Sequence, residues 1–128
     1  MKLNPDCMRD ILIFAESIEY GTQSTLTKLS KALPKYPIEE LDYSSGKLYE
    51  AGLIDAVFLP KQLHIGDVLS KLNGLTYDGH QLLANIRNEK IWEPTKSIAK
   101  EIGATSIQAL TQIATGVVTQ IITKHLGY

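Results

Sequence analysis

The sequence has little of what marks several large classes of protein. Cys7 is its one cysteine in 128 residues, so neither an internal disulfide nor a zinc cage of several cysteines can form. Thirteen basic and fourteen acidic side chains give a formal net charge of −1, which excludes a polybasic nucleic-acid tail and an acidic disordered segment. Only two methionines and three histidines are available as further ligands, which argues against a haem or metal protein. The 44% of hydrophobic residues suffices for one buried core.

The N-terminus lacks a long apolar run followed by a small-residue cleavage site, so we expect no signal peptide. Residues 102–123 carry no charge, but Gln108, Gln112 and Gln120 interrupt the apolar residues, so we expect no membrane span there. A single cysteine is compatible with a reducing compartment, and we expect a cytoplasmic protein.

Three helices are predicted in the first half of the chain. Asn4 can cap the first helix, Pro5 suits its first position, and Gly21 is a natural stop. A short helix is expected over residues 25–33, followed by a third that Pro37 opens and Gly52 closes, with Leu53 placed to pack back against it. The residues expected on the buried side of this third helix are Ile38, Leu41, Ser45, Leu48 and Tyr49.

A β-hairpin and three further helices are predicted after these. The strands are expected within residues 54–59 and 68–75, the second interrupted by Asn73 and Gly74. Thr76 can cap the next helix. Another helix follows Asn88 and ends at Gly103, with Pro94 either opening it or kinking its first turn. The last helix is expected over about residues 105–125.

This order of elements resembles the winged helix-turn-helix, on the motifs LYEAGLID at 48–55 and LTYDGHQLLANI at 75–86. With MKLNPDCMRDIL at 1–12, KLYEAGLIDA at 47–56 and LTYDGHQLLANIRNEKIWEPTK at 75–96, the chain resembles an uncharacterised bacterial and prophage family, catalogued as a domain of unknown function. The resemblance implies a mainly helical α+β fold with a winged-helix core, a small hairpin wing and a C-terminal two-helix extension. We expect one domain overall, with the core over residues 1–88 and the extension over 89–128.

DNA binding is one function that this resemblance raises. The third helix, which would enter the major groove, carries Glu39, Glu40 and Glu50 against Lys47 on its predicted solvent side. Because phosphate contacts require basic side chains, charge does not favour DNA as a partner. The candidate nucleic-acid contacts are Lys28, Lys31, Lys35, Tyr43, Lys47, Lys61, His64 and Lys71.

The last helix is the candidate dimer interface. Its polar side carries threonine and glutamine where a surface helix normally carries Lys and Glu, and threonine is a below-average helix former. An uncharged face of small residues suits close packing of helices, so we expect a homodimer, against the alternative of a half-exposed threonine-rich helix. The candidate interface residues are Thr111, Thr115, Val118, Thr119 and Ile122.

No motif for catalysis is present: there is no Gly-rich phosphate loop, Gly-x-Ser-x-Gly or HExxH sequence. We therefore expect no enzyme, no cofactor, no metal and no small-molecule substrate. The leading hypothesis is a non-enzymatic binding module of the DNA-associated regulator type. The alternative is a protein-interaction or assembly module with a winged-helix fold and no DNA binding.

Overall fold

A computed structural model describes residues 1–60 and 67–127. Within them the chain forms six α-helices and one antiparallel sheet of two strands, so the fold is mixed α+β, as predicted at that level. The chain divides into two compact units, residues 1–80 and 81–128. The division expected near residue 88 stays a prediction.

The first two helices begin as predicted. In α1 (Pro5–Glu16) the side chain of Asn4 accepts hydrogen bonds from the backbone N–H groups of Asp6 and Cys7, and Pro5 occupies the first helical position. In α2 (Leu26–Ala32) the Thr25 side chain accepts from the Lys28 N–H. The predicted stop at Gly21 is wrong, because α1 already ends at Glu16. Gly21 has a left-handed backbone (φ 80°) in the turn that follows α1.

The third helix, α3 (Ile38–Glu50), ends in a hydrogen-bonded glycine cap. Gly52 has φ 76° and donates to the Tyr49 carbonyl, while the Leu53 N–H donates to the Leu48 carbonyl. This Schellman motif satisfies carbonyls that the helix end would leave free, as the Gly52–Leu53 pair predicts. Pro37 precedes the helix without a side-chain cap.

The predicted buried side of α3 is too wide. Leu41, Ser45 and Leu48 are fully buried, but Ile38 and Tyr49 are 42% and 49% exposed. The apolar stripe gives the direction of the core, but neighbouring elements cover only its middle, and they also bury Ser44. Glu40, expected on the solvent side, is half-buried and accepts a hydrogen bond of 2.9 Å from the Asn4 side chain.

The two strands, β1 (Ile54–Pro60) and β2 (Asp67–Leu75), pair antiparallel as predicted. Asp55 pairs with Gly74, but the next residue, Ala56, pairs with Leu72. Asn73 therefore has no partner in the ladder and forms a β-bulge. On the other edge of β2, Ser24 forms an isolated antiparallel bridge with Leu72. The spatial order is therefore Ser24, β2, β1.

Helix α4 (Tyr77–Ile86) starts against the end of α3. Thr76, the predicted cap, accepts a hydrogen bond from the Gly79 N–H and donates through its hydroxyl to the Gly52 carbonyl at 2.6 Å. Its own N–H donates to the Leu53 carbonyl. A Cβ atom on Gly79 would lie 1.9 Å from the Leu53 carbonyl oxygen, so this position has room only for glycine.

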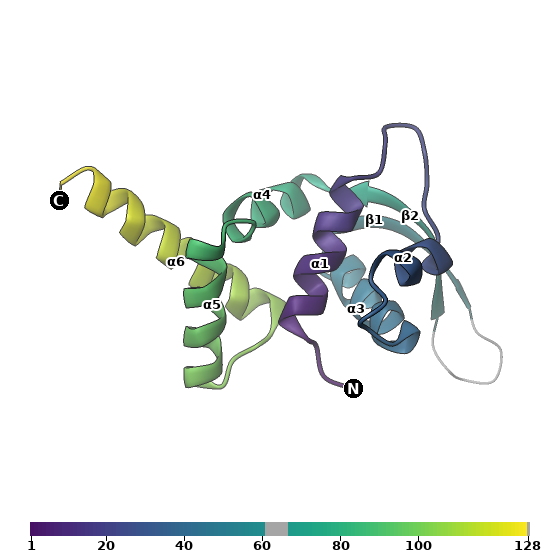
Figure 1. The fold of residues 1–128 in the computed structure, drawn as a ribbon, viewed down its shortest axis with the longest axis horizontal. Coiled ribbons are helices and arrows are strands. Elements are labelled where there is room, and N and C mark those ends of the chain that lie inside the picture. The colour runs from purple at the N-terminus through teal and green to yellow at the C-terminus, as the bar shows by residue number, and fades with distance from the viewer. Residues whose placement is uncertain (61–66, 128) are drawn as a thin grey trace. The chain divides into compact units, whose positions relative to one another are not determined.

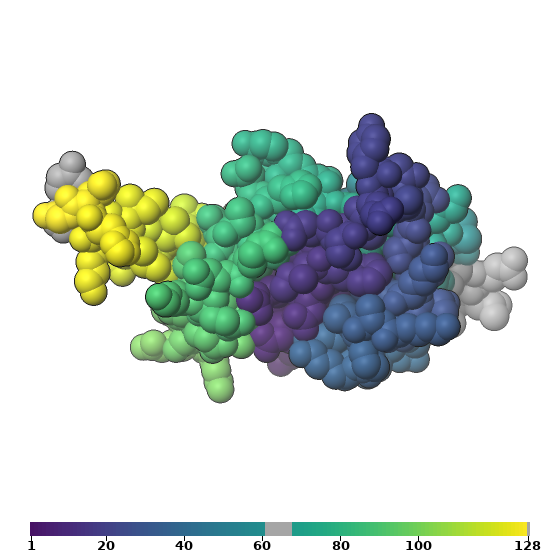
Figure 2. Space-filling model, turned by 45° about the horizontal axis from the view of Figure 1, so that its top comes forward, coloured from purple at the N-terminus to yellow at the C-terminus, as the bar shows by residue number. Residues whose placement is uncertain are grey.

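In the first unit, α1, α2 and α3 pack together with the hairpin (Figure 1). The segment between α1 and α2, dark blue, projects from the surface of this unit (Figure 2), and its Tyr20 is fully exposed. The core of this unit consists of large apolar side chains that are fully buried, among them Met8, Ile11, Leu12, Leu29, Leu41, Leu48, Ile54 and Leu72.

The second unit contains α5 (Glu89–Ile102) and α6 (Ile107–His125), which pack against each other (Figure 1). Helix α5 follows Asn88 and ends at Gly103, as predicted. The Asn88 side chain caps its start, and Gly103 has a left-handed backbone (φ 72°). Pro94 lies inside the helix, so it does not open it. Among the described residues, no helix combines the length and apolar character that crossing a membrane requires.

We predict that the free energy of unfolding falls by about 2 kcal/mol between pH 9 and pH 11, because of Cys7. Burial raises the pKa of this thiol from 9.0 to about 11, so the native state keeps its proton where the unfolded chain has lost it. The contribution is full below pH 9 and is lost as the pH rises through 11. Denaturant titrations along this range measure it.

The control is Cys7→Ala, which removes the thiol and flattens the alkaline decline. Burial and the hydrogen bond that the Tyr36 hydroxyl donates to Asp10 at 2.7 Å also raise the pKa of Tyr36, so some decline remains in this variant. Identical slopes for the two proteins would contradict the assignment to Cys7.

Candidate interaction surfaces

The lysines predicted to contact nucleic acid do not form one uniform surface. Lys28 and Lys31 are exposed on α2, and Lys71 is exposed on β2. Lys35 is bound to Asp10 at 3.3 Å and lies over the Tyr36 ring. Lys61 and His64, expected on the wing, lie outside the described residues.

The outer face of α3 is acidic and partly occupied by its own contacts. The ammonium group of Lys47 binds the Glu50 carboxylate at 3.1 Å and lies 5.5 Å from the centre of the Tyr43 ring. The hydrogen bond to Glu50 raises the pKa of Lys47. Glu39 is exposed on the same face. The one lysine on this helix is thus neutralised locally, and the helix presents little positive charge to a phosphate.

Asp42 joins α3 to the hairpin, a contact that the sequence does not reveal. Its Oδ1 atom accepts a hydrogen bond of 2.8 Å from the Leu69 N–H of β2. The two residues are 27 positions apart, and neither has a local motif that links it to the other. Asp42 therefore positions the second strand of the hairpin on α3 and is not a free acid of the helix face.

The candidate dimer face of α6 has an unusual chemistry. The hydroxyl groups of Thr111, Thr115 and Thr119 each donate to the carbonyl four residues earlier, at 2.8, 2.9 and 2.8 Å. Because these hydroxyls are bonded to their own helix, the helix can pack its threonine side without leaving them unpaired. Thr115 and Thr119 are exposed, and Thr111 and Val118 are half-buried.

Apolar side chains continue this exposed face towards the C-terminal end. Leu110 and Ala114 are fully buried, but Ile122 and Leu126 are 52% and 64% exposed. Gly116 lies in the same helix, and in the described part of the chain a Cβ there would meet no atom of another element within 4 Å. The second half of α6 therefore presents methyl groups and small residues to solvent.

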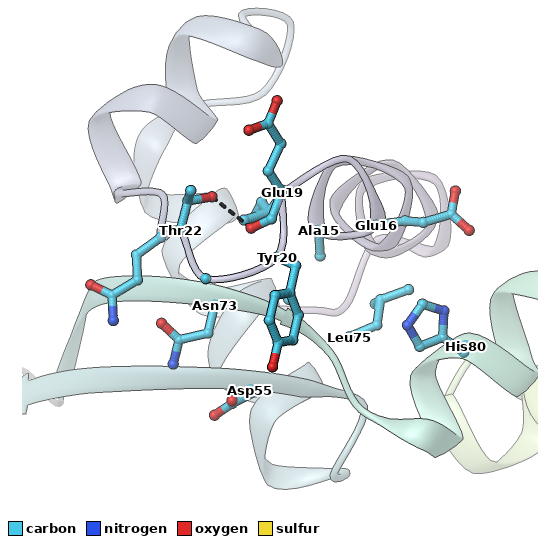
Figure 3. Close-up of a pocket in the computed structure, with 13 residues that line it drawn as sticks. Ala15, Glu16, Glu19, Tyr20, Thr22, Asp55, Asn73, Leu75 and His80 are labelled. Atoms are coloured by element: carbon cyan, nitrogen blue, oxygen red, sulfur yellow. Dashed lines mark hydrogen bonds between the residues drawn. The ribbon is translucent and has the colours of Figure 1, made fainter.

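A hollow of about 540 Å³ lies in the first unit, between the end of α1, the turn after it, the bulge of the hairpin and the start of α4. Tyr20 and His80 extend towards it, and the bulged residue Asn73 lies beneath (Figure 3). Thr22 closes one side, with its hydroxyl bonded to the Glu19 carbonyl at 2.7 Å.

This hollow has acidic residues but no convergent binding groups. The carboxylates of Glu16, Glu19 and Asp55 point in different directions (Figure 3). Within the described part of the chain, no three His, Cys, Asp or Glu side chains gather closely enough to hold a metal ion. The Asn-Gly pair at 73–74 was the one sequence signal of this site, since it marks the bulge.

Two comparisons with known proteins found similar sequences. Residues 2–106 match the family model described as "Hypothetical protein (DUF2513)". An "Uncharacterized protein" of Haemophilus influenzae is 30% identical over 123 residues, which cover 95% of this chain and 99% of the relative. No solved structure matches. On both the family model and this relative, the chain belongs to the DUF2513 family of uncharacterised proteins.

Proposed function

We propose that the chain is a non-enzymatic binding module with a winged-helix core, which associates through α6 and acts by contacting other protein chains. The winged-helix assignment is supported by the order of three helices and a hairpin, and by the bridge from Ser24 to Leu72. That bridge supplies the short first strand that lies between the first two helices in a winged helix. The proposed location is the cytoplasm.

The observation that carries the proposal is the exposed face of α6. Residues 102–123 have no charge, the threonine hydroxyls are bonded to their own helix, and Ile122 is 52% exposed. Hydration of such a surface contributes little favourable free energy, and a second helix can cover it without burying an unpaired polar group. The same face of α6 on a second copy can pack against it, because neither copy places a charged side chain in the contact.

The double variant Thr115→Lys/Thr119→Lys tests this association. Two ammonium groups on the contact face are expected to raise the dissociation constant by at least tenfold, because each must be buried against an uncharged surface. Sedimentation velocity measures the mass, which for the wild-type chain is expected to reach at least twice 14.2 kDa. A matched control is Thr27→Lys/Thr105→Lys, which changes two exposed threonines outside this face. A wild-type chain that stays monomeric at high concentration rules the association out.

The outer face of α3 favours a protein partner over DNA. Glu39 and Glu50 repel phosphates, and Lys47 is held by Glu50. Gly46 lies in the middle of the helix, where glycine costs about 1 kcal/mol relative to alanine. Apart from its chain neighbours and the backbone of its own helix, a Cβ there would meet no described atom within 4 Å. Together with Tyr43, it offers a partner backbone close approach beside an aromatic side chain, a composition typical of protein interfaces.

A DNA-associated regulator is the second candidate, because Lys28, Lys31 and Lys71 are exposed on α2 and β2. It predicts an affinity for duplex DNA that falls steeply with salt and weakens in Lys28→Glu/Lys31→Glu, but not in Lys100→Glu on α5. Our proposal expects no binding of a mixed-sequence duplex at low salt in a fluorescence anisotropy titration. Salt-sensitive binding that depends on the two α2 lysines would replace the protein-contact function with the DNA-associated one.

A further inference from the structure

We draw no further inference here: the strongest candidate, the acidic hollow between the end of α1, the bulge of the hairpin and the start of α4, has carboxylates that point in different directions (Figure 3), and no second feature among the described residues points to a ligand that would fill it.

Discussion

Gly79→Ala is expected to lower the free energy of unfolding by about 3 kcal/mol, a large effect for one methyl group. The new Cβ would lie 1.9 Å from the carbonyl oxygen of Leu53 and 3.3 Å from the Leu75 side chain. The contact is with backbone, so no side-chain rotation relieves it. The start of α4 must then move away from the cap of α3, and the hydrogen bond from Thr76 to the Gly52 carbonyl is strained or lost. Urea denaturation followed by circular dichroism measures the change.

Gly46→Ala is the matched control for this prediction. It adds the same methyl group to a helix, but among the described residues a Cβ at this position meets no atom of another element within 4 Å. Alanine is expected to stabilise α3 by about 1 kcal/mol through its higher helix propensity. If both variants change stability by the same amount and in the same direction, then close packing at Gly79 is not the cause. The control also bears on function, since it adds bulk to the face of α3 that we propose for a protein partner.

Trp92→Ala is expected to lower the free energy of unfolding by about 4 kcal/mol. Trp92 is the largest side chain that is fully buried, with 1% of its surface exposed. Its removal leaves a cavity in addition to the lost apolar burial, and the neighbouring residues fill that cavity only in part. Thermal unfolding and the concentration of urea at half-unfolding report the loss.

Trp92→Phe serves as the partial replacement. Phenylalanine keeps most of the apolar surface and leaves a smaller void, so its expected loss is less than half that of the alanine variant. Hydrogen exchange identifies where the stability is lost, because α5 and α6 belong to the same unit and should lose protection together. Equal losses in the two variants would show that the void is not what destabilises the protein.

The sequence predicted best those features that depend on neighbouring residues. The residues that begin or end a helix act within one turn of it, and their predicted positions are confirmed. They are Asn4 with Pro5, Gly52 with Leu53, Asn88 and Gly103. The buried width of α3 was predicted less well. Periodicity shows which direction faces the core, but the exposure of Ile38 and Tyr49 depends on how far other elements extend over them.

Apart from the pairing of the two hairpin strands, contacts between distant segments could not be predicted. The hydrogen bond from the Leu69 N–H to Asp42 joins residues 27 apart. The bridge from Ser24 to Leu72 joins the predicted second strand to a residue whose own sequence carries no strand pattern. The outer position of β1 follows from that bridge, because the order of strands is known only once Ser24 is found beside β2. The composition of α6 did indicate an unusual surface, but the hydroxyl bonds that explain it required side-chain positions.

The threonine bonds of α6 also affect the path of the helix axis. A hydroxyl that donates to the carbonyl four residues earlier competes with the backbone N–H for that carbonyl, and such bonds bend helices slightly. Here three of them follow one another along one flank, from Ile107 to Thr119, so their bends add in a similar direction. α6 is therefore expected to be a curved rod, and curvature selects among partners. A straight helix contacts a curved one over a short length, so a partner helix must itself bend to follow this flank for several turns.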